Sequence, residues 1–188
     1  MTKYPDLIDL IHAIDRQLEG AVGGADRSVF GATAPEVMVK YILVKVGTRT
    51  LAIGIDSLAE VGVLPKITAL PNLPWWILGI MNIRSEIISM VDFTGFLQER
   101  QPVRNHASKL VVLRNDKVKV GIGVDAIVGT VNIVVQEILP NVNGDAESIE
   151  KMLFPSRLLS NGVAYSILDV GKFLTHPRLI DFDVKRSS

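Results

Sequence analysis

The chain has 188 residues, 48% of them hydrophobic, which is enough to bury one or two compact cores without disulfide bonds. Its 20 basic and 20 acidic residues balance, so no global charge draws the protein to nucleic acid, anionic lipid or acidic substrates. The absence of cysteine excludes disulfides, thiolate nucleophiles and thiolate metal ligands. These totals predict a soluble globular protein with no nucleic-acid partner.

The first 36 residues are predicted to form an amphipathic helix followed by a flexible connector. Asp6 precedes apolar residues at helical spacing, Gly20 supplies a stop, and residues 20–36 are rich in Gly and Ala. The helix would either pack on its own domain or dock in a partner's groove. Acidic residues interrupt this segment and prolines break the apolar stretch at residues 67–83, so the sequence predicts neither a signal peptide nor direct membrane insertion.

From residue 37 onward, short runs dense in β-branched residues predict strands. Residues 37–46 and 50–55 form the first pair, joined by a short turn that contains Gly47. Residues 56–61 are predicted to form a short helical turn. After an irregular, proline-rich connection the strand composition resumes, and this half of the chain closes with a short helix or turn.

The second half of the chain repeats the plan of the first. The sequence IGVDAI from Ile122 matches IGIDSL from Ile53, at an offset of 69 residues. The sequence SILDVGKFL from Ser166 matches SMVDFTGFL from Ser89, at an offset of 77. Two correspondences in the same order indicate an internal duplication.

A doubled β-rich unit with short turns predicts a mostly-β fold of two small barrels with short helices. We expect the first barrel over residues 37–104 and the second over residues 105–170. A closing helix to residue 178 and a tail at residues 179–188 would follow. Each half is small for an independent core, so the two barrels are expected to share a hydrophobic seam.

Residues with catalytic or ligand-binding chemistry are sparse. The three histidines share no metal-ligand spacing, and the sequence has no nucleophile elbow, phosphate-binding loop or dinucleotide fingerprint. Four aspartates follow strands in V-D, I-D or L-D pairs, and each is predicted to cap the turn that follows it; they are Asp56, Asp92, Asp125 and Asp169. The alternative is a pair of carboxylates acting in hydrolysis, which requires two of them to converge in a cleft. We expect no catalytic residue, no cofactor and no metal.

The segment from Trp75 to Arg84 is the most distinctive in the chain. Neighbouring side chains on a strand leave on opposite faces, so Trp75 and Trp76 cannot both point inward, and one of them is expected to be exposed. Exposed aromatic surface beside an arginine is typical of a binding hot spot, although a core tryptophan with its neighbour along a loop is the alternative. Arg84, predicted to lie within an apolar strand, would form either an intramolecular ion pair or a partner contact.

The ordered motifs over residues 39–174 resemble the CheW family of chemotaxis adaptors. The most specific part is GIMNIR followed by IISMVDF, which is similar to the family's glycine, N-L-R-G and an aliphatic strand ending in V-D-L. The resemblance implies two intertwined five-stranded β-barrel subdomains of the SH3-like kind and no catalysis. It also implies a cytoplasmic protein that is recruited to membrane-associated receptor arrays.

The resemblance implies two partners: the regulatory domain of a CheA-type histidine kinase and the cytoplasmic tip of a methyl-accepting chemoreceptor. By position, Gly79, Asn82 and Arg84 match the family's receptor-binding motif, and Leu58 and Glu60 match residues at its partner surfaces. The expected function is coupling receptors to the kinase in chemotaxis or pilus motility. The alternatives are a β-barrel protein-binding module outside chemosensory arrays and a carboxylate hydrolase.

Two departures from the family pattern suggest a divergent branch. Ser85 replaces the family's glycine after the arginine, and Ser89-Met90 replaces its common proline before V-D. If the glycine normally has a positive φ, Ser85 would carry a small conformational cost or lie in a slightly different turn.

Overall fold

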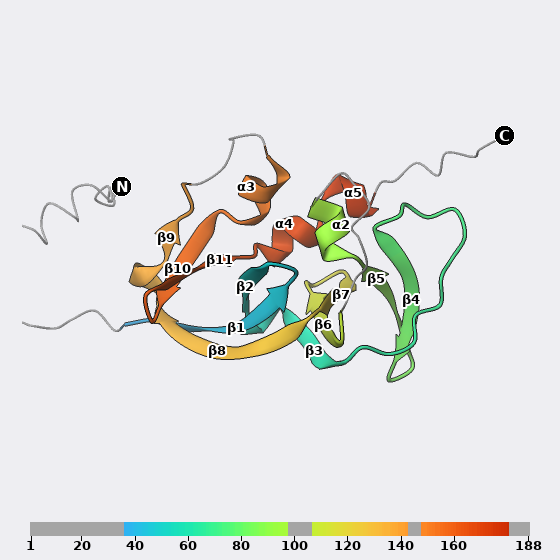
Figure 1. Cartoon of the computed structure of the whole chain (residues 1–188), viewed down its shortest axis with the longest axis horizontal. Helices are drawn as coiled ribbons and strands as arrows, with labels where there is room; N and C mark the ends of the chain where they lie inside the picture. The colour runs from blue at the N-terminus through green and yellow to red at the C-terminus, as the bar shows by residue number, and fades with distance from the viewer. Residues whose placement is uncertain (1–35, 98–106, 143–147, 181–188) are drawn as a thin grey trace, which may run out of the picture. The chain divides into compact units, whose positions relative to one another are not determined.

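The computed structural model describes residues 36–97, 107–142 and 148–180 (Figure 1). The predicted helix and connector therefore lie outside the described residues, except for Glu36, and so do residues 181–188 of the predicted tail. Within the described ranges, no helix combines the length and the apolar character needed to cross a membrane.

Two sheets make up most of the described chain. The six-stranded sheet contains β1 (Met38–Val46), β2 (Arg49–Gly54), β8 (Ala126–Val134), β9 (Leu139–Pro140), β10 (Ser156–Ser160) and β11 (Val163–Ile167). The five-stranded sheet contains β3 (Leu58–Val63), β4 (Ile77–Ile83), β5 (Glu86–Val91), β6 (Lys109–Arg114) and β7 (Lys119–Val124). The short helices are η1 (Ile55–Ser57), α2 (Phe93–Leu97), η2 (Val135–Glu137), α3 (Ile149–Leu153), α4 (Val170–Leu174) and α5 (Pro177–Ile180). The mostly-β prediction is confirmed.

Each sheet combines strands from both halves of the chain. The first follows the order β8-β1-β2-β11-β10-β9 and the second the order β3-β6-β7-β5-β4 (Figure 1). The predicted division into barrels at residues 37–104 and 105–170 is therefore wrong for the sheets. The physical reason is that each half gives its first hairpin to the other half. The β1–β2 hairpin pairs with β8 and β11, and the β6–β7 hairpin pairs with β3 and β5.

The strand registers confirm the duplication. The offset of 69 residues carries the pair Val61 with Val111, in β3 and β6, onto the pair Thr130 with Ile42, in β8 and β1. Both of these ladders also contain a bulge or irregularity. The parallel pairs β2–β11 and β5–β7 also correspond. The offset of 69 carries Leu51 of β2 onto Val120 of β7, and the offset of 77 carries Ser89 of β5 onto Ser166 of β11.

Both sheets curl so that their end strands approach each other. In the six-stranded sheet, the end strands β8 and β9 are joined through η2 and Ile138 alone, which forces the two ends of the sheet together. In the five-stranded sheet, Thr68 adds an isolated bridge to Ile80 beyond the end strand β4. An ion pair between Glu60 on β3 and Arg84 after β4 joins the opposite ends of that sheet. This curvature is typical of small barrels.

Three buried clusters follow from this arrangement. One cluster inside the six-stranded sheet includes Tyr41, and its counterpart in the five-stranded sheet includes the equivalent Leu110. The largest cluster contains residues from both sheets, including the equivalent Val44 and Leu113, together with the helices α2 and α4. Both of these side chains are fully buried. The expected hydrophobic seam between the barrels is therefore present.

Aromatic side chains from the two equivalent helices fill the centre of this seam. Phe93 and Phe96 of α2 each contact Phe173 of α4 edge to face, with ring centroids 5.2 Å apart in both pairs. All three rings are almost completely buried. Burying one such side chain stabilises a fold by about 1.5–3 kcal/mol, so these helices fix the two sheets to each other.

Two local predictions were wrong. Residues 58–61 form the start of β3 rather than a helical turn, because pairing with β6 overrides the weak strand propensity of Ala59 and Glu60. The helical part is only η1, whose N-cap is Gly54 without a side-chain cap, so Asp56 does not cap it. The predicted closing helix is two short helices, α4 and α5, and the second extends to Ile180.

Candidate partner-binding surface

The β4–β5 hairpin ends in a two-residue turn made of Arg84 and Ser85. Arg84 therefore lies in a turn and not within a strand as predicted. Both residues have positive φ, 50° for Arg84 and 70° for Ser85, a region that non-glycine residues seldom adopt. The turn is supported by the Ser85 N–H, which donates to Asn82 Oδ1 at 3.0 Å. Of the two outcomes left open for Ser85, a conformational cost or a different turn, its positive φ favours the conformational cost.

Arg84 projects from this turn and pairs with Glu60 on β3. Its Nε lies 3.4 Å from Glu60 Oε2, and the arginine side chain is 84% exposed against 29% for the glutamate. The sequence left two roles open for Arg84, an intramolecular ion pair or a partner contact. The pair exists, and the exposure leaves the guanidinium accessible to another protein.

The β4–β5 hairpin also carries an exposed apolar side chain, and a second ion pair joins it to β7. Lys119 Nζ of β7 lies 2.6 Å from Glu86 Oε2, directly after the turn. Ile87 is 69% exposed and faces Asn82 across the hairpin. Side chains directly opposite on paired strands share a face, so Ile87 and Asn82 present one mixed surface. Sequence reasoning missed Ile87, because it lies in an otherwise ordinary apolar run.

Gly79 and Leu58, the other two predicted site residues, have structural positions. Gly79 has φ 135° at an irregularity in the β4–β5 ladder, and a Cβ there would collide with the Thr68 backbone carbonyl. Thr68 and Ile80 exchange backbone hydrogen bonds of 2.8 and 2.9 Å at this crossing. Leu58 is partly buried and packs against the seam cluster. Of the five predicted residues, the structure thus brings Glu60, Asn82 and Arg84 together at the surface.

The two tryptophans precede β4 in a turn, so the strand argument about their faces does not apply. Both are half-buried, and their rings contact each other edge to face at 5.6 Å. Trp76 packs against the seam cluster, and the Arg178 guanidinium of α5 lies 4.5 Å from its ring centroid. A side chain at Gly95 would collide with Trp75. The pair therefore anchors α2 and α5. Of the two alternatives, a core tryptophan with its neighbour along a loop is favoured over an exposed tryptophan.

The capping prediction is confirmed at two of the four aspartates. Asp92 Oδ1 accepts the Gly95 N–H at 3.1 Å, and Asp169 Oδ1 accepts the Lys172 N–H at 2.9 Å. Asp92 is buried, and burial raises the pKa of its carboxyl against the opposing effect of backbone hydrogen bonds. Asp125 instead caps the β1–β2 turn, accepting a hydrogen bond of 2.7 Å from the N–H of residue 47.

Groups suited to metal binding or acid-base work do not gather in the described part of the chain. His12 and His106 lie outside it, and His176 has its pKa lowered by burial and by Arg178. Across residues 36–97, 107–142 and 148–180, no three His, Asp or Glu side chains are placed to hold a metal ion.

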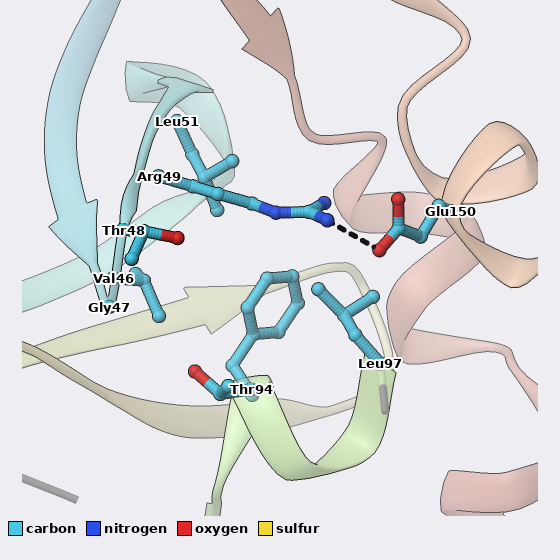
Figure 2. A pocket seen from close by; sticks show the side chains of 9 residues that line it. Val46, Gly47, Thr48, Arg49, Leu51, Thr94, Leu97 and Glu150 are labelled. Carbon is cyan, nitrogen blue, oxygen red and sulfur yellow. Dashed lines mark ion pairs between the residues drawn. The ribbon is translucent and has the colours of Figure 1, made fainter. Parts of the chain in front are cut away.

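A small hollow of about 180 Å³ lies between the β1–β2 turn and α2 (Figure 2). Figure 2 shows Arg49 extending toward Glu150 of α3, with Thr94 and Leu97 on the opposite side of the hollow. The Arg49 and Glu150 side chains form an ion pair of 2.8 Å and are both about half exposed. The ion pair between Arg49 and Glu150 therefore spans this hollow.

Residues 40–178 match the CheW-like domain family. Protein FrzA of Myxococcus xanthus is 26% identical over 153 residues, which cover 81% of this chain and 94% of that protein. Protein PilI of Pseudomonas aeruginosa is 33% identical over 86 residues, which cover 45% of this chain and 48% of that protein. A probable chemotaxis protein CheW of Rhizobium etli is 27% identical over 113 residues, which cover 57% of this chain and 71% of that protein.

A solved structure has the same fold. The crystal structure of the scaffolding protein TtCheW from Thermoanaerobacter tengcongensis matches with a TM-score of 0.64 at 19% identity, covering 79% of this chain and 97% of that one. The family match spans both sheets and every described helix up to the start of α5. The chain therefore belongs to the CheW-like adaptor family.

Proposed function

We propose that the chain is a non-catalytic cytoplasmic adaptor that couples chemoreceptors to a CheA-type histidine kinase, in chemotaxis or pilus motility. The observation that carries this proposal is the β4–β5 turn, where a family motif presents an 84% exposed arginine on a strained backbone. Strain of this kind persists where the surrounding structure maintains it for a function.

The fold suits a protein that holds partners in a fixed register. The seam cluster joins the two sheets through buried aromatic side chains, so surfaces on different sheets keep a constant separation. Charged side chains at a rim select partners more than they add affinity. Arg84 would meet an acidic position on the receptor tip, while Glu60 holds the guanidinium in place before binding.

The remaining predicted residues have supporting roles in this proposal. Asn82 shapes the turn that carries Arg84, and Gly79 permits the close crossing of Thr68 over β4. Leu58 fixes the start of β3, next to Glu60. Asn82, Gly79 and Leu58 would therefore act on partner binding through the position of Arg84.

The test is the affinity of the full chain for a receptor cytoplasmic fragment. We expect Arg84→Glu to weaken binding about tenfold with the fold unchanged, because it reverses the charge at the contact. The matched control is Asn161→Glu, which places the same charge at the equivalent turn of β10–β11 and should leave the affinity unchanged.

A double variant separates the internal ion pair from the partner contact. Arg84→Glu combined with Glu60→Arg restores an internal pair of opposite polarity. If Arg84 contacts the receptor, this double variant stays weak; if only the internal pair matters, it recovers binding. An unaltered affinity in Arg84→Glu would refute the proposed role.

A further inference from the structure

A second hollow, of about 280 Å³, lies beside α5 on the five-stranded sheet. We call it the α5 groove, and its apolar lining includes Leu70, Ile77, Ile80, Val118, Leu174 and Ile180. An apolar cavity of about 150 Å³ is large enough to bind benzene, so the α5 groove can hold an aromatic side chain.

The α5 groove is the counterpart of the hollow in Figure 2. The offset of 69 residues carries Arg49 onto Val118, and the offset of 77 carries Leu97 onto Leu174. The first hollow is bridged by the ion pair of Arg49 with Glu150. At the position equivalent to Arg49 the α5 groove has Val118, so its opening is apolar.

Three residues at the α5 groove leave apolar surface exposed. Leu70 is 42% exposed, Val118 is 39% exposed and Ile180 is 63% exposed. Grouped apolar exposure of this kind marks a surface that another segment covers. Two exposed basic side chains, Lys117 and Lys119, flank Val118. Lys119 already pairs with Glu86 at 2.6 Å, and the exposed Asp116 precedes Lys117.

The sequence that continues from Ile180 matches this surface. In residues 181–184, Phe182 and Val184 alternate with Asp181 and Asp183. Such alternation places apolar side chains on one face and acids on the other in an extended segment. Two extended residues span about 7 Å, so Phe182 can reach the groove from Ile180, which already lines it.

We propose that residues 181–184 of the same chain occupy the α5 groove. Phe182 inserts beside Val118, and the two aspartates lie near Lys117 and Lys119. Occupation by this segment would cover the exposed apolar surface of the groove.

Disulfide trapping tests this proposal, because the chain has no cysteine of its own. The test pair is Lys117→Cys with Asp183→Cys, and the control pair is Thr48→Cys with Asp183→Cys, because Thr48 is the equivalent position at the other hollow. With oxidised glutathione as oxidant, we expect the test pair to close about tenfold faster, since docking raises the effective concentration of the two thiols.

Two further measurements identify the occupant. Phe182→Ala added to the test pair should slow closure toward the control rate, whereas Ser187→Ala should not. Equal rates in the test and control pairs would overturn the proposal. Mixing the two single-cysteine variants would overturn it as well if dimers formed as fast as the intramolecular bond, because a second copy would then be the occupant.

Discussion

The two equivalent hairpin turns of the duplicated unit have nearly the same φ angles but different residues. At the β4–β5 turn, Arg84 and Ser85 have φ of 50° and 70°; at the equivalent β10–β11 turn, Asn161 and Gly162 have φ of 51° and 75°. Asn-Gly is the favoured sequence for a two-residue turn with two positive φ values, whereas Arg-Ser is not. One copy therefore keeps the residues that favour the turn, and the other accepts conformational strain.

This difference supports the proposal that the strained copy serves partner binding. The strained turn carries the exposed Arg84 and its ion pair with Glu60, and its backbone is held by Asn82. Strained residues of this kind concentrate at functional sites. The unstrained turn is the natural control for each experiment on the strained one.

The largest expected effect concerns Gly79 and its equivalent, Ser156. A side chain at Gly79 meets the Thr68 carbonyl at a positive φ, whereas Ser156 lies in β10 in regular pairing with Ile167. We expect Gly79→Ala to lower the free energy of unfolding by about 3 kcal/mol or more, and Ser156→Ala by less than about 1 kcal/mol. Denaturant unfolding measures both. Similar losses in the two variants would contradict the structural role of Gly79.

Exchanging the two turns should change stability in opposite directions. Replacing Arg84-Ser85 by Asn-Gly should raise the free energy of unfolding by about 1 kcal/mol and weaken receptor binding, because it removes both the strain and the arginine. Replacing Asn161-Gly162 by Arg-Ser should lower it by about 1–2 kcal/mol. Thermal or denaturant unfolding provides the measurement. Equal stability of all three proteins would show that the turn residues carry no strain.

The two capping aspartates should differ in their response to pH. Burial raises the pKa of Asp92 above its usual 3.8, so the folded protein holds this proton more tightly than the unfolded chain does. That contribution to stability is present below the unfolded pKa and is lost as pH rises through the folded pKa. As pH rises above the usual range of an aspartate, wild type should therefore lose stability relative to Asp92→Asn.

The matched control for this pH experiment is Asp169→Asn, which changes the equivalent cap of α4. Unfolding of the three proteins in urea over the same rise in pH gives the comparison. If wild type and Asp92→Asn kept a constant difference in stability, the buried carboxyl would not titrate differently in the folded state.

The smallest expected effect is on the ion pair itself. Glu60→Gln should change the free energy of unfolding by less than about 0.5 kcal/mol, because Arg84 is largely exposed and water screens the pair. The affinity of Glu60→Gln for the receptor fragment tests the proposed role of Glu60 in positioning Arg84. A loss of stability above about 2 kcal/mol would mean that the pair holds the sheet ends together.

Local features of the fold were predictable because they depend on neighbours in the sequence. The β1–β2 hairpin, the caps at Asp92 and Asp169, and the duplication all follow from short patterns. The exchange of the β1–β2 and β6–β7 hairpins between the two halves was not predictable, since it depends on contacts between distant parts of the chain. The sequence pattern predicts a strand at Arg84 because Arg84 and Ser85 include neither the Gly nor the Asn that normally marks a two-residue turn.

The candidate site was predictable only in part for the same reason. The family resemblance suggests Arg84 by its motif and Glu60 by its position, but the ion pair between them requires the two ends of one sheet to meet. Ile87 carried no local signal, because its exposure depends on which face of β5 is covered. The α5 groove depends on helix placement after the second copy, which strand patterns do not encode.

The most decisive experiment asks whether the chain joins a receptor to a kinase. Receptor cytoplasmic fragments on vesicles would be sedimented with a CheA-type kinase, with and without the full chain. We expect the kinase to sediment with the receptor when the wild-type chain is added, and much less with Arg84→Glu. Recovery of the kinase that is the same with and without the chain would contradict the adaptor function.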